Sequence, residues 1–257
     1  REVSKTDFKA RVPALRAELL EVQRKLASSG VPVIIIVSGM QAAGKGEVVD
    51  RLNHWLDPRW VQTTAYWDES DEDRDRPRYW RFWRTLPPRG EIGVLFGAWY
   101  QSPIERRMAG AVGDAELDVK LGRIEDFERM LIRDGALIVK FWFHMSKRDQ
   151  QKRFKQLSRD DRSRWANLPT KESFSKHYEQ FERLAERVVR ATDTGMAPWY
   201  LIEATNRRYR DLAVGETLLR TLQARLARTE ADETEHAPGG PVLPNLPGAR
   251  RTLLDDI

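Results

Sequence analysis

The sequence has 257 residues, 40% hydrophobic and 32% charged, which is the balance of a globular chain long enough for one large domain. Its 44 Lys and Arg residues against 39 Asp and Glu residues give a formal net charge of +5, which allows a polyanionic partner without requiring one. The lack of cysteine excludes disulfides and thiolate metal sites and favours a cytoplasmic location, and no apolar run approaches the ~20 residues that cross a bilayer.

Along the chain, short apolar runs alternate with segments of helical periodicity. Runs rich in β-branched and aromatic residues predict strands at 31–39, 60–67, 91–100, 136–145 and 197–205. Helical spacing predicts helices at 7–29, 44–56, 79–90, 116–135 and 208–228, and a basic, helix-rich segment from 147 to about 192. Strands that alternate with helices predict an α/β fold with a parallel, doubly wound sheet.

Two other stretches are read from their composition. The acidic stretch 68–78 is interpreted as a solvated loop or the start of a helix. Residues 229–257 are rich in Pro, Gly and acidic residues, which is typical of a tail or interdomain linker. We therefore predict one domain over residues 1–228, followed by a tail or linker.

The stretch "GMQAAGKG" follows the first apolar strand and opens a helix, so it satisfies G-x-x-x-x-G-K in the context that a phosphate-binding loop requires. Small residues let backbone N–H groups turn around phosphate oxygens, and the helix N-terminus faces the same anion. Lys45 is the candidate catalytic residue, as a cation that follows the transferred group. The predicted loop ligands are Gly39, Gln41, Ala42, Ala43, Gly44, Lys45, Gly46 and Glu47.

The same letters allow a simpler interpretation. Gly46 stands where this motif usually has the Ser or Thr that holds magnesium. A glycine-rich strand-to-helix turn with a solvated Lys45 would have a similar sequence. The length of the motif and its position after a buried strand favour phosphate binding.

Four stretches together, "GMQAAGKGE", "RPRYWRFWRTLPPRGEIGVLFGAWY", "KFWFHMSKRDQQKRF" and "TDTGMAPWYLIEA", resemble the polyphosphate kinase 2 family. They are most similar to the N-terminal domain of its two-domain members, the polyphosphate:AMP phosphotransferases. The resemblance implies a P-loop kinase-like parallel sheet flanked by helices, with a helical lid at about 147–170. It also implies transfer between inorganic polyphosphate and AMP or ADP with Mg²⁺, and a second domain of the same chain. By the same resemblance, Arg81 and Arg153 are further phosphate-binding residues.

The sequence departs from the family pattern at both positions where the resemblance implies an Asp that organises magnesium, so the metal ligands stay unidentified. Those positions are Gln41, in the loop, and Phe96, near the end of the third strand. Metal charge neutralisation is central to phosphoryl transfer, so this departure favours weak catalysis. Asp68, Glu69 or Asp71 could replace the missing carboxylates.

Three functions therefore stay open. The first is a polyphosphate-dependent nucleotide phosphotransferase, and the second is a degenerate, non-catalytic domain that binds polyphosphate or supports a second catalytic domain. The third, an ordinary ATP-dependent kinase, explains the loop but not the four stretches. Nucleic acid is disfavoured as a partner, because the aromatic residues are not interleaved with the basic segment.

Overall fold

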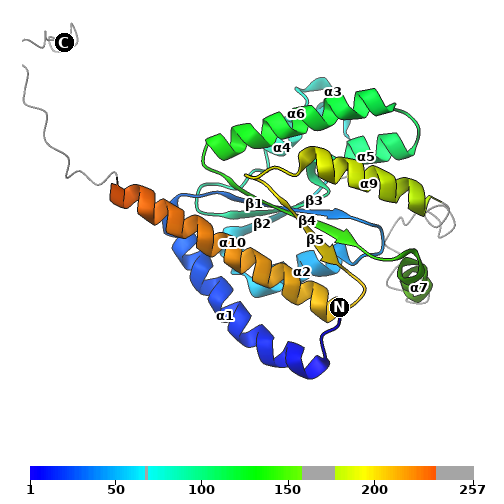
Figure 1. Ribbon diagram of the computed structural model, residues 1–257. Helices are drawn as coiled ribbons and strands as arrows, with labels where there is room; N and C mark the ends of the chain where they lie inside the picture. Colours follow the sequence, from blue (N-terminus) through cyan, green and yellow to red (C-terminus); the bar gives the residue numbers. More distant parts are fainter. Residues whose placement is uncertain (67–68, 158–176, 236–257) are drawn as a thin grey trace, which may run out of the picture.

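The computed structural model describes residues 1–66, 69–157 and 177–235. Its centre is one five-stranded sheet in the order β2-β3-β1-β4-β5, in which every neighbouring pair is parallel (Figure 1). The predicted α/β fold with a parallel sheet is therefore confirmed. The strands are β1 (Val33–Gly39), β2 (Val61–Ala65), β3 (Ile92–Phe96), β4 (Leu137–His144) and β5 (Trp199–Glu203).

Helices cover both faces of the sheet. One face carries α1, α2 and α10, and the other carries α5, α6 and α9 (Figure 1). The described helices are α1 (Lys5–Ser29), α2 (Lys45–Trp55), α3 (Asp71–Asp75), α4 (Trp80–Trp83), α5 (Gln101–Met108), α6 (Asp114–Arg133), α7 (Lys147–Leu157), α9 (Tyr178–Thr192) and α10 (Arg207–Glu235).

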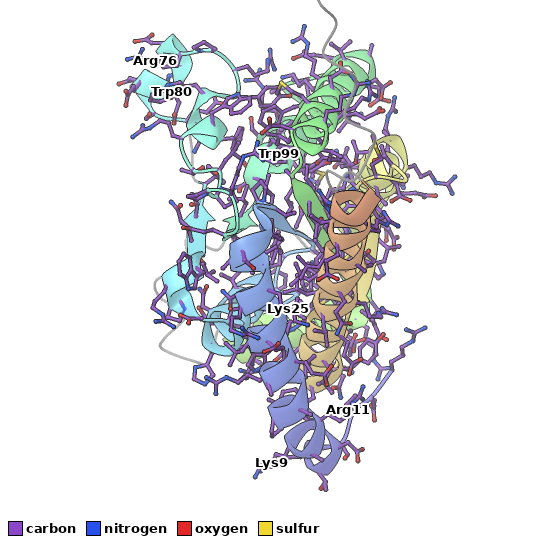
Figure 2. The ribbon with its side chains drawn as sticks, turned by 90° about the vertical axis from the view of Figure 1, so that its left-hand side faces the viewer. Lys9, Arg11, Lys25, Arg76, Trp80 and Trp99 are labelled. Carbon is purple, nitrogen blue, oxygen red and sulfur yellow. The ribbon has the colours of Figure 1, made fainter. Side chains whose placement is uncertain are left out.

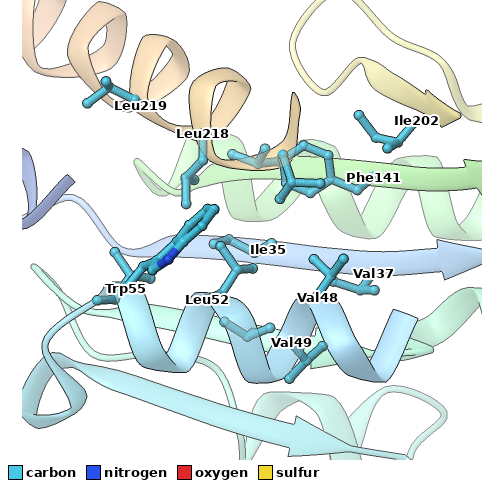
Figure 3. Packing of buried hydrophobic residues seen from close by; sticks show 14 of the residues in the cluster. Ile35, Val37, Val48, Val49, Leu52, Trp55, Phe141, Ile202, Leu218 and Leu219 are labelled. Carbon is cyan, nitrogen blue, oxygen red and sulfur yellow. The ribbon is translucent and has the colours of Figure 1, made fainter. Parts of the chain in front are cut away.

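The central strand β1 explains the two layers, because all seven of its residues are buried. Alternate side chains of a strand point to opposite faces. Ile35 and Val37 pack in the cluster under α1, α2 and α10, whereas Ile34 and Ile36 pack in the cluster under α6 and α9. Figure 3 shows the first cluster, where Leu52 of α2 faces Ile35. The continuous apolar sequence of β1 is thus the consequence of burial on both faces.

The third strand is shorter than the sequence predicts, and a helix follows it that was not predicted. Residues 91–100 were predicted as one strand, but β3 ends at Phe96 because Gly97 and Ala98 have positive φ angles of 83° and 45°. The apolar residues from Ala98 to Tyr100 form a buried 3₁₀ turn instead. The helix α5 escaped prediction because it buries only Ile104 and so has no apolar stripe.

The predicted helix at 79–90 and the predicted end of the domain also differ, since α4 covers only Trp80–Trp83. The predicted end of the domain at residue 228 falls inside a helix, because α10 continues to Glu235, and residues 236–257 of the predicted tail lie outside the described residues. The acidic stretch forms the short helix α3, which Ser70 and Asp73 cap reciprocally. Of the predicted lid at about 147–170, residues 147–157 form α7 and the rest is outside the described ranges, as is Asp68.

Among the three described ranges, no helix combines the length and apolar character needed to cross a membrane.

Candidate phosphate-binding site

The predicted loop connects β1 to α2 at the carboxyl edge of the sheet, where ligands of parallel α/β folds bind. Gly39 has φ 119°, and a Cβ atom at this position would lie 2.3 Å from the carbonyl oxygen of Phe143 in β4. Only glycine fits there, and the next residue, Met40, donates its backbone N–H to the same oxygen at 2.9 Å. The loop is therefore tied to the neighbouring strand.

Gly44 is required by a different contact. It has φ 77° and begins α2, and a Cβ atom on it would lie 1.7 Å from Nη1 of Arg210 in α10. Arg210 is only 2% exposed; it donates to the carbonyl oxygen of Ala43 at 3.2 Å and to Asp211 at 2.8 Å. The buried guanidinium of Arg210 thus braces the loop from α10.

Lys45 folds back over the loop. Its Nζ donates to the carbonyl oxygens of Gly39 at 2.5 Å and Met40 at 3.2 Å. Burial lowers the pKa of this ammonium to about 8, and the negative charge of Glu105 in α5 partly opposes that shift. At neutral pH Lys45 is therefore a cation that is held inside the loop by weak carbonyl partners.

Glu47, in the first turn of α2, contacts arginines from two other helices. Its carboxylate accepts hydrogen bonds from Arg153 of α7 and, at 2.9 Å, from Arg210, and Nε of Arg207 lies 3.6 Å away. Burial alone would raise the pKa of Glu47, but the hydrogen bond from Arg210 and the charges of the three arginines outweigh it and lower the pKa. We call Glu47, Arg153, Arg207 and Arg210 the Glu47 cluster.

A cavity of about 250 Å³ lies beside the loop, next to the Glu47 cluster. It is bounded by the loop, by the start of α7 and by the residues that follow β5. Its lining residues are Ala42, Glu47, Met145, Asp149, Lys152, Arg153, Gln156, Ala204, Thr205, Arg207 and Arg210.

A larger cavity of about 960 Å³ lies beyond the ends of β2 and β3. Arg81 lines this cavity and not the smaller one: its guanidinium lies 5.3 Å from the ring centre of Tyr66 and 3.7 Å from a carboxylate oxygen of Asp73. Figure 2 shows Arg76 and Trp80 on the outlying α3–α4 segment and Trp99 farther in. The lining includes Tyr66, Glu69, Asp73, Arg74, Arg76, Arg78, Tyr79, Arg81, Phe82, Ala98, Trp99, Gln101, Ser102, Glu105, Arg106, Glu116 and Lys120.

The wall that Ala98 and Trp99 contribute to this larger cavity is held from behind by a buried ion pair. Nζ of Lys140 in β4 lies 2.7 Å from a carboxylate oxygen of Glu128 in α6, and both side chains are at most 2% exposed. The other oxygen of Glu128 accepts from Trp99 Nε1 at 3.0 Å and from the Tyr100 hydroxyl at 2.7 Å. The turn after β3 is therefore fixed by hydrogen bonds inside the core.

The carboxylates at the loop do not form a magnesium site. Gln41 and Phe96 supply an amide and an apolar ring where the resemblance implies Asp, and Gly46 has no side chain. Glu47 already pairs with arginines, and Asp149 pairs with a serine and a lysine. Within residues 1–66, 69–157 and 177–235, no three His, Cys, Asp or Glu side chains are grouped to hold a metal ion. The described residues therefore do not fit a protein-held Mg²⁺.

The structure thus brings most of the predicted site residues together. Ala42 and Glu47 of the loop line the smaller cavity together with Arg153, whereas Arg81 lines the larger one. Sequence reasoning missed Arg207 and Arg210. A signal for Arg210 existed, since Arg210, Val214, Leu218 and Leu222 share one buried helical face, where an arginine is conspicuous.

Comparison with known proteins agrees with this geometry. Residues 2–230 match the family model described as Polyphosphate kinase 2 (PPK2). A Pseudomonas aeruginosa protein named polyphosphate:AMP phosphotransferase is 42% identical over 257 residues, which are 99% of this chain and 51% of that protein. A protein of the same name from Pseudomonas syringae pv. tomato is 39% identical over 251 residues, 97% of this chain and 50% of the relative.

One solved structure supports the same fold assignment. The crystal structure of polyphosphate kinase 2 from Arthrobacter aurescens TC1 superposes with a TM-score of 0.81 at 30% identity, covering 86% of this chain and 80% of that one. The chain spans about half the length of the two Pseudomonas relatives.

Proposed function

Because the chain belongs to the polyphosphate kinase 2 family, we propose that it is a phosphotransferase domain that moves a phosphoryl group between inorganic polyphosphate and a nucleotide, AMP or ADP. The observation that carries the proposal is the loop from Gly39 to Lys45, whose glycines with positive φ angles and folded-back lysine suit a phosphate-binding loop in a chain of this family. The expected second domain and the cytoplasmic location belong to the same proposal, and the Mg²⁺ that the family resemblance implies would come bound to its phosphate ligands, since the described residues do not fit a protein-held site. The second domain is supported by relatives about twice as long as this chain.

In this proposal the loop holds polyphosphate. The N-terminus of α2 points its unpaired backbone N–H groups at the anion. Lys45 exchanges the carbonyl oxygens of Gly39 and Met40 for phosphate oxygens, and its positive charge stabilises the charge on the transferred group. Arg153 approaches from α7 on the side of the smaller cavity.

The larger cavity is the proposed nucleotide site. Its volume is in the range of small-molecule sites, and it combines aromatic rings with arginines. Arg81, already near Tyr66, is then a ligand of the nucleotide's phosphate instead of a ligand at the loop.

A second candidate function is favoured by one observation, the lack of carboxylates at Gln41 and Phe96. A domain with this loop and no protein-held metal would bind polyphosphate without transferring it, because charge neutralisation by metal is a large part of this catalysis. The chemistry would then belong to another domain.

The test is phosphoryl transfer from long-chain polyphosphate to AMP or ADP with Mg²⁺, with polyphosphate binding measured in parallel. Lys45→Ala is compared with wild type, and Lys25→Ala, on the surface of α1, is the matched control. Transfer that Lys45→Ala abolishes and Lys25→Ala leaves intact supports the phosphotransferase. Binding that depends on Lys45, without transfer, supports the second candidate. Binding and transfer that are indifferent to Lys45 contradict both.

A further inference from the structure

The Glu47 cluster has more positive than negative charge at the edge of the loop. One carboxylate faces three guanidinium groups, from Arg153, Arg207 and Arg210. Asp149 of α7 also lines this cavity, but it accepts a hydrogen bond from Ser146 at 2.7 Å and pairs with Lys152 at 3.3 Å. The cavity of about 250 Å³ is therefore lined by four cationic side chains and two carboxylates.

The three arginines are held differently. Arg210 is almost completely buried and is fixed by Asp211 and by the carbonyl oxygen of Ala43, so it cannot leave. The side chains of Arg153 and Arg207 are 31% and 61% exposed, and both line the cavity. These two can change partners by rotation of their side chains, without movement of the helices.

Glu47 is also exchangeable. Its side chain is 27% exposed, and it stands in the first turn of α2. The space beside the neighbouring Gly46 is open, because a Cβ atom there would meet nothing within 4 Å. Guanidinium groups bind carboxylate and phosphate oxygens in the same fork geometry, so phosphate can replace the carboxylate without loss of hydrogen bonds.

We infer that Glu47 is an internal counter-ion: in the ligand-free protein it occupies the anion site formed by Arg153, Arg207 and Arg210, and an oligophosphate must displace it to bind there. The choice of oligophosphate rests on the proposed function. Displacement favours ligands with several phosphate groups, because a single phosphate competes alone with a carboxylate that is tethered at the site, whereas a chain of phosphates also contacts the neighbouring loop. Glu47 thereby sets both the affinity and the minimum chain length of the ligand.

The experiment measures calorimetric binding of inorganic tripolyphosphate and of orthophosphate, without nucleotide or metal, at low and at physiological salt. In Glu47→Gln the amide keeps the size of the side chain but loses its charge. The dissociation constant of tripolyphosphate is expected to fall roughly fivefold, the upper end for a partly exposed ion pair. The discrimination against orthophosphate is expected to shrink. Glu21→Gln, which makes the same change of charge on α1, is expected to match wild type.

A double-mutant cycle with Arg153→Gln tests the pairing itself. Loss of Arg153 is expected to weaken tripolyphosphate binding more in the Glu47→Gln background than in wild type, because Glu47 no longer neutralises it. Glu47→Asp retracts the carboxylate from the arginines and is expected to tighten binding by a smaller factor than Glu47→Gln. It also provides a folded variant should the amide disturb α2.

Three results would overturn the inference. The first is weaker tripolyphosphate binding by Glu47→Gln, which would mean that Glu47 organises the arginines. The second is an effect of Glu47→Gln equal to that of Glu21→Gln. The third is that none of these proteins binds tripolyphosphate. Phosphoryl transfer is assayed separately. Tighter binding by Glu47→Gln in a protein without transfer would refute the phosphotransferase and keep the counter-ion. Active phosphoryl transfer, together with tripolyphosphate binding that Glu47→Gln leaves unchanged, would support the phosphotransferase and refute the counter-ion.

Discussion

Two ion-paired groups of the molecule differ in how completely their charges are satisfied. Lys140 and Glu128 are both buried in the core under α6 and α9, and each has several hydrogen-bond partners. In the Glu47 cluster, the carboxylate and two of the three arginines are partly exposed, and positive charge is in excess. The charges of the first group are satisfied within the protein, whereas the second group has an excess of positive charge that can bind an anion.

The difference follows from the cost of burying charge. A buried ion must be paired and hydrogen-bonded, because it has lost its water. Lys140 satisfies this with Glu128, the Tyr100 hydroxyl and the carbonyl oxygen of Thr192. Burial lowers the pKa of Lys140, while the nearby Glu128 charge opposes that shift. Lys140 therefore has no free hydrogen-bonding capacity for a ligand. The half-exposed arginines near the loop, in contrast, can exchange Glu47 for another anion at a small cost in free energy.

The largest expected effect comes from breaking the buried pair. Lys140→Met leaves the Glu128 carboxylate buried without its cation, and we expect it to lower the free energy of unfolding by about 3–5 kcal/mol. Urea denaturation measures this. The matched control is Lys147→Met, because Lys147 pairs with Glu179 at the surface at 2.8 Å, and its loss is expected to cost at most about 1 kcal/mol.

The double variant Lys140→Met/Glu128→Gln sharpens the same comparison. It removes the stranded charge, so it should recover part of the stability that the single variant loses. Equal costs for Lys140→Met and Lys147→Met would show that the two kinds of ion pair do not differ as the structure indicates.

The sequence predicted the parts of this fold that local patterns encode. The strand β1 was recognisable because burial on both faces demands an unbroken apolar run, and the loop because close approach of Gly39 to β4 permits no side chain. No prediction was made for Lys140, although it is one charged residue within an otherwise apolar strand. Its partner Glu128 could not be identified, because Glu128 lies on α6 and the pairing is purely tertiary.

The remaining errors have the same origin. The residues from Ala98 to Tyr100 are apolar enough to extend a strand, and only the positive φ angles before them and the hydrogen bonds to Glu128 turn them into a wall of the larger cavity. Arg153 could be placed by family resemblance, but its contact with Glu47 depends on how α7 and α2 meet in space. The Glu47 cluster therefore could not be assembled from the sequence.

An intermediate effect is expected from Gly44→Ala, which disturbs the contact between the loop and the fixed member of the Glu47 cluster. The new methyl group would collide with Arg210, and a φ of 77° strains any residue with a Cβ atom. We expect a loss of about 1–3 kcal/mol in the free energy of unfolding and weaker tripolyphosphate binding. Thermal or urea unfolding and calorimetry measure the two effects.

The matched control for that prediction is Gly46→Ala, two residues farther along the chain. Gly46 lies within α2, and a Cβ atom there would meet nothing within 4 Å, so the change should be neutral or slightly stabilising. If Gly44→Ala behaved like Gly46→Ala, Arg210 would not brace the loop.

The smallest expected effect concerns the charge of Lys45, which is intermediate between the two groups compared above. Its side chain is half-buried, and its hydrogen-bond partners are the carbonyl oxygens of Gly39 and Met40. Its pKa of about 8 in the free protein must rise when phosphate supplies a negative partner, so binding above pH 8 takes up a proton and weakens as the pH increases. Between pH 7 and 9 we expect the affinity for tripolyphosphate to fall by at most about tenfold. Lys45→Arg is the control, because arginine keeps its charge throughout this range. Ionisation of tripolyphosphate affects both proteins equally, so the ratio of their dissociation constants reports only the protonation of Lys45. A ratio that stays constant from pH 7 to 9 would mean that Lys45 remains protonated, and that burial in the loop does not weaken its hold on the proton.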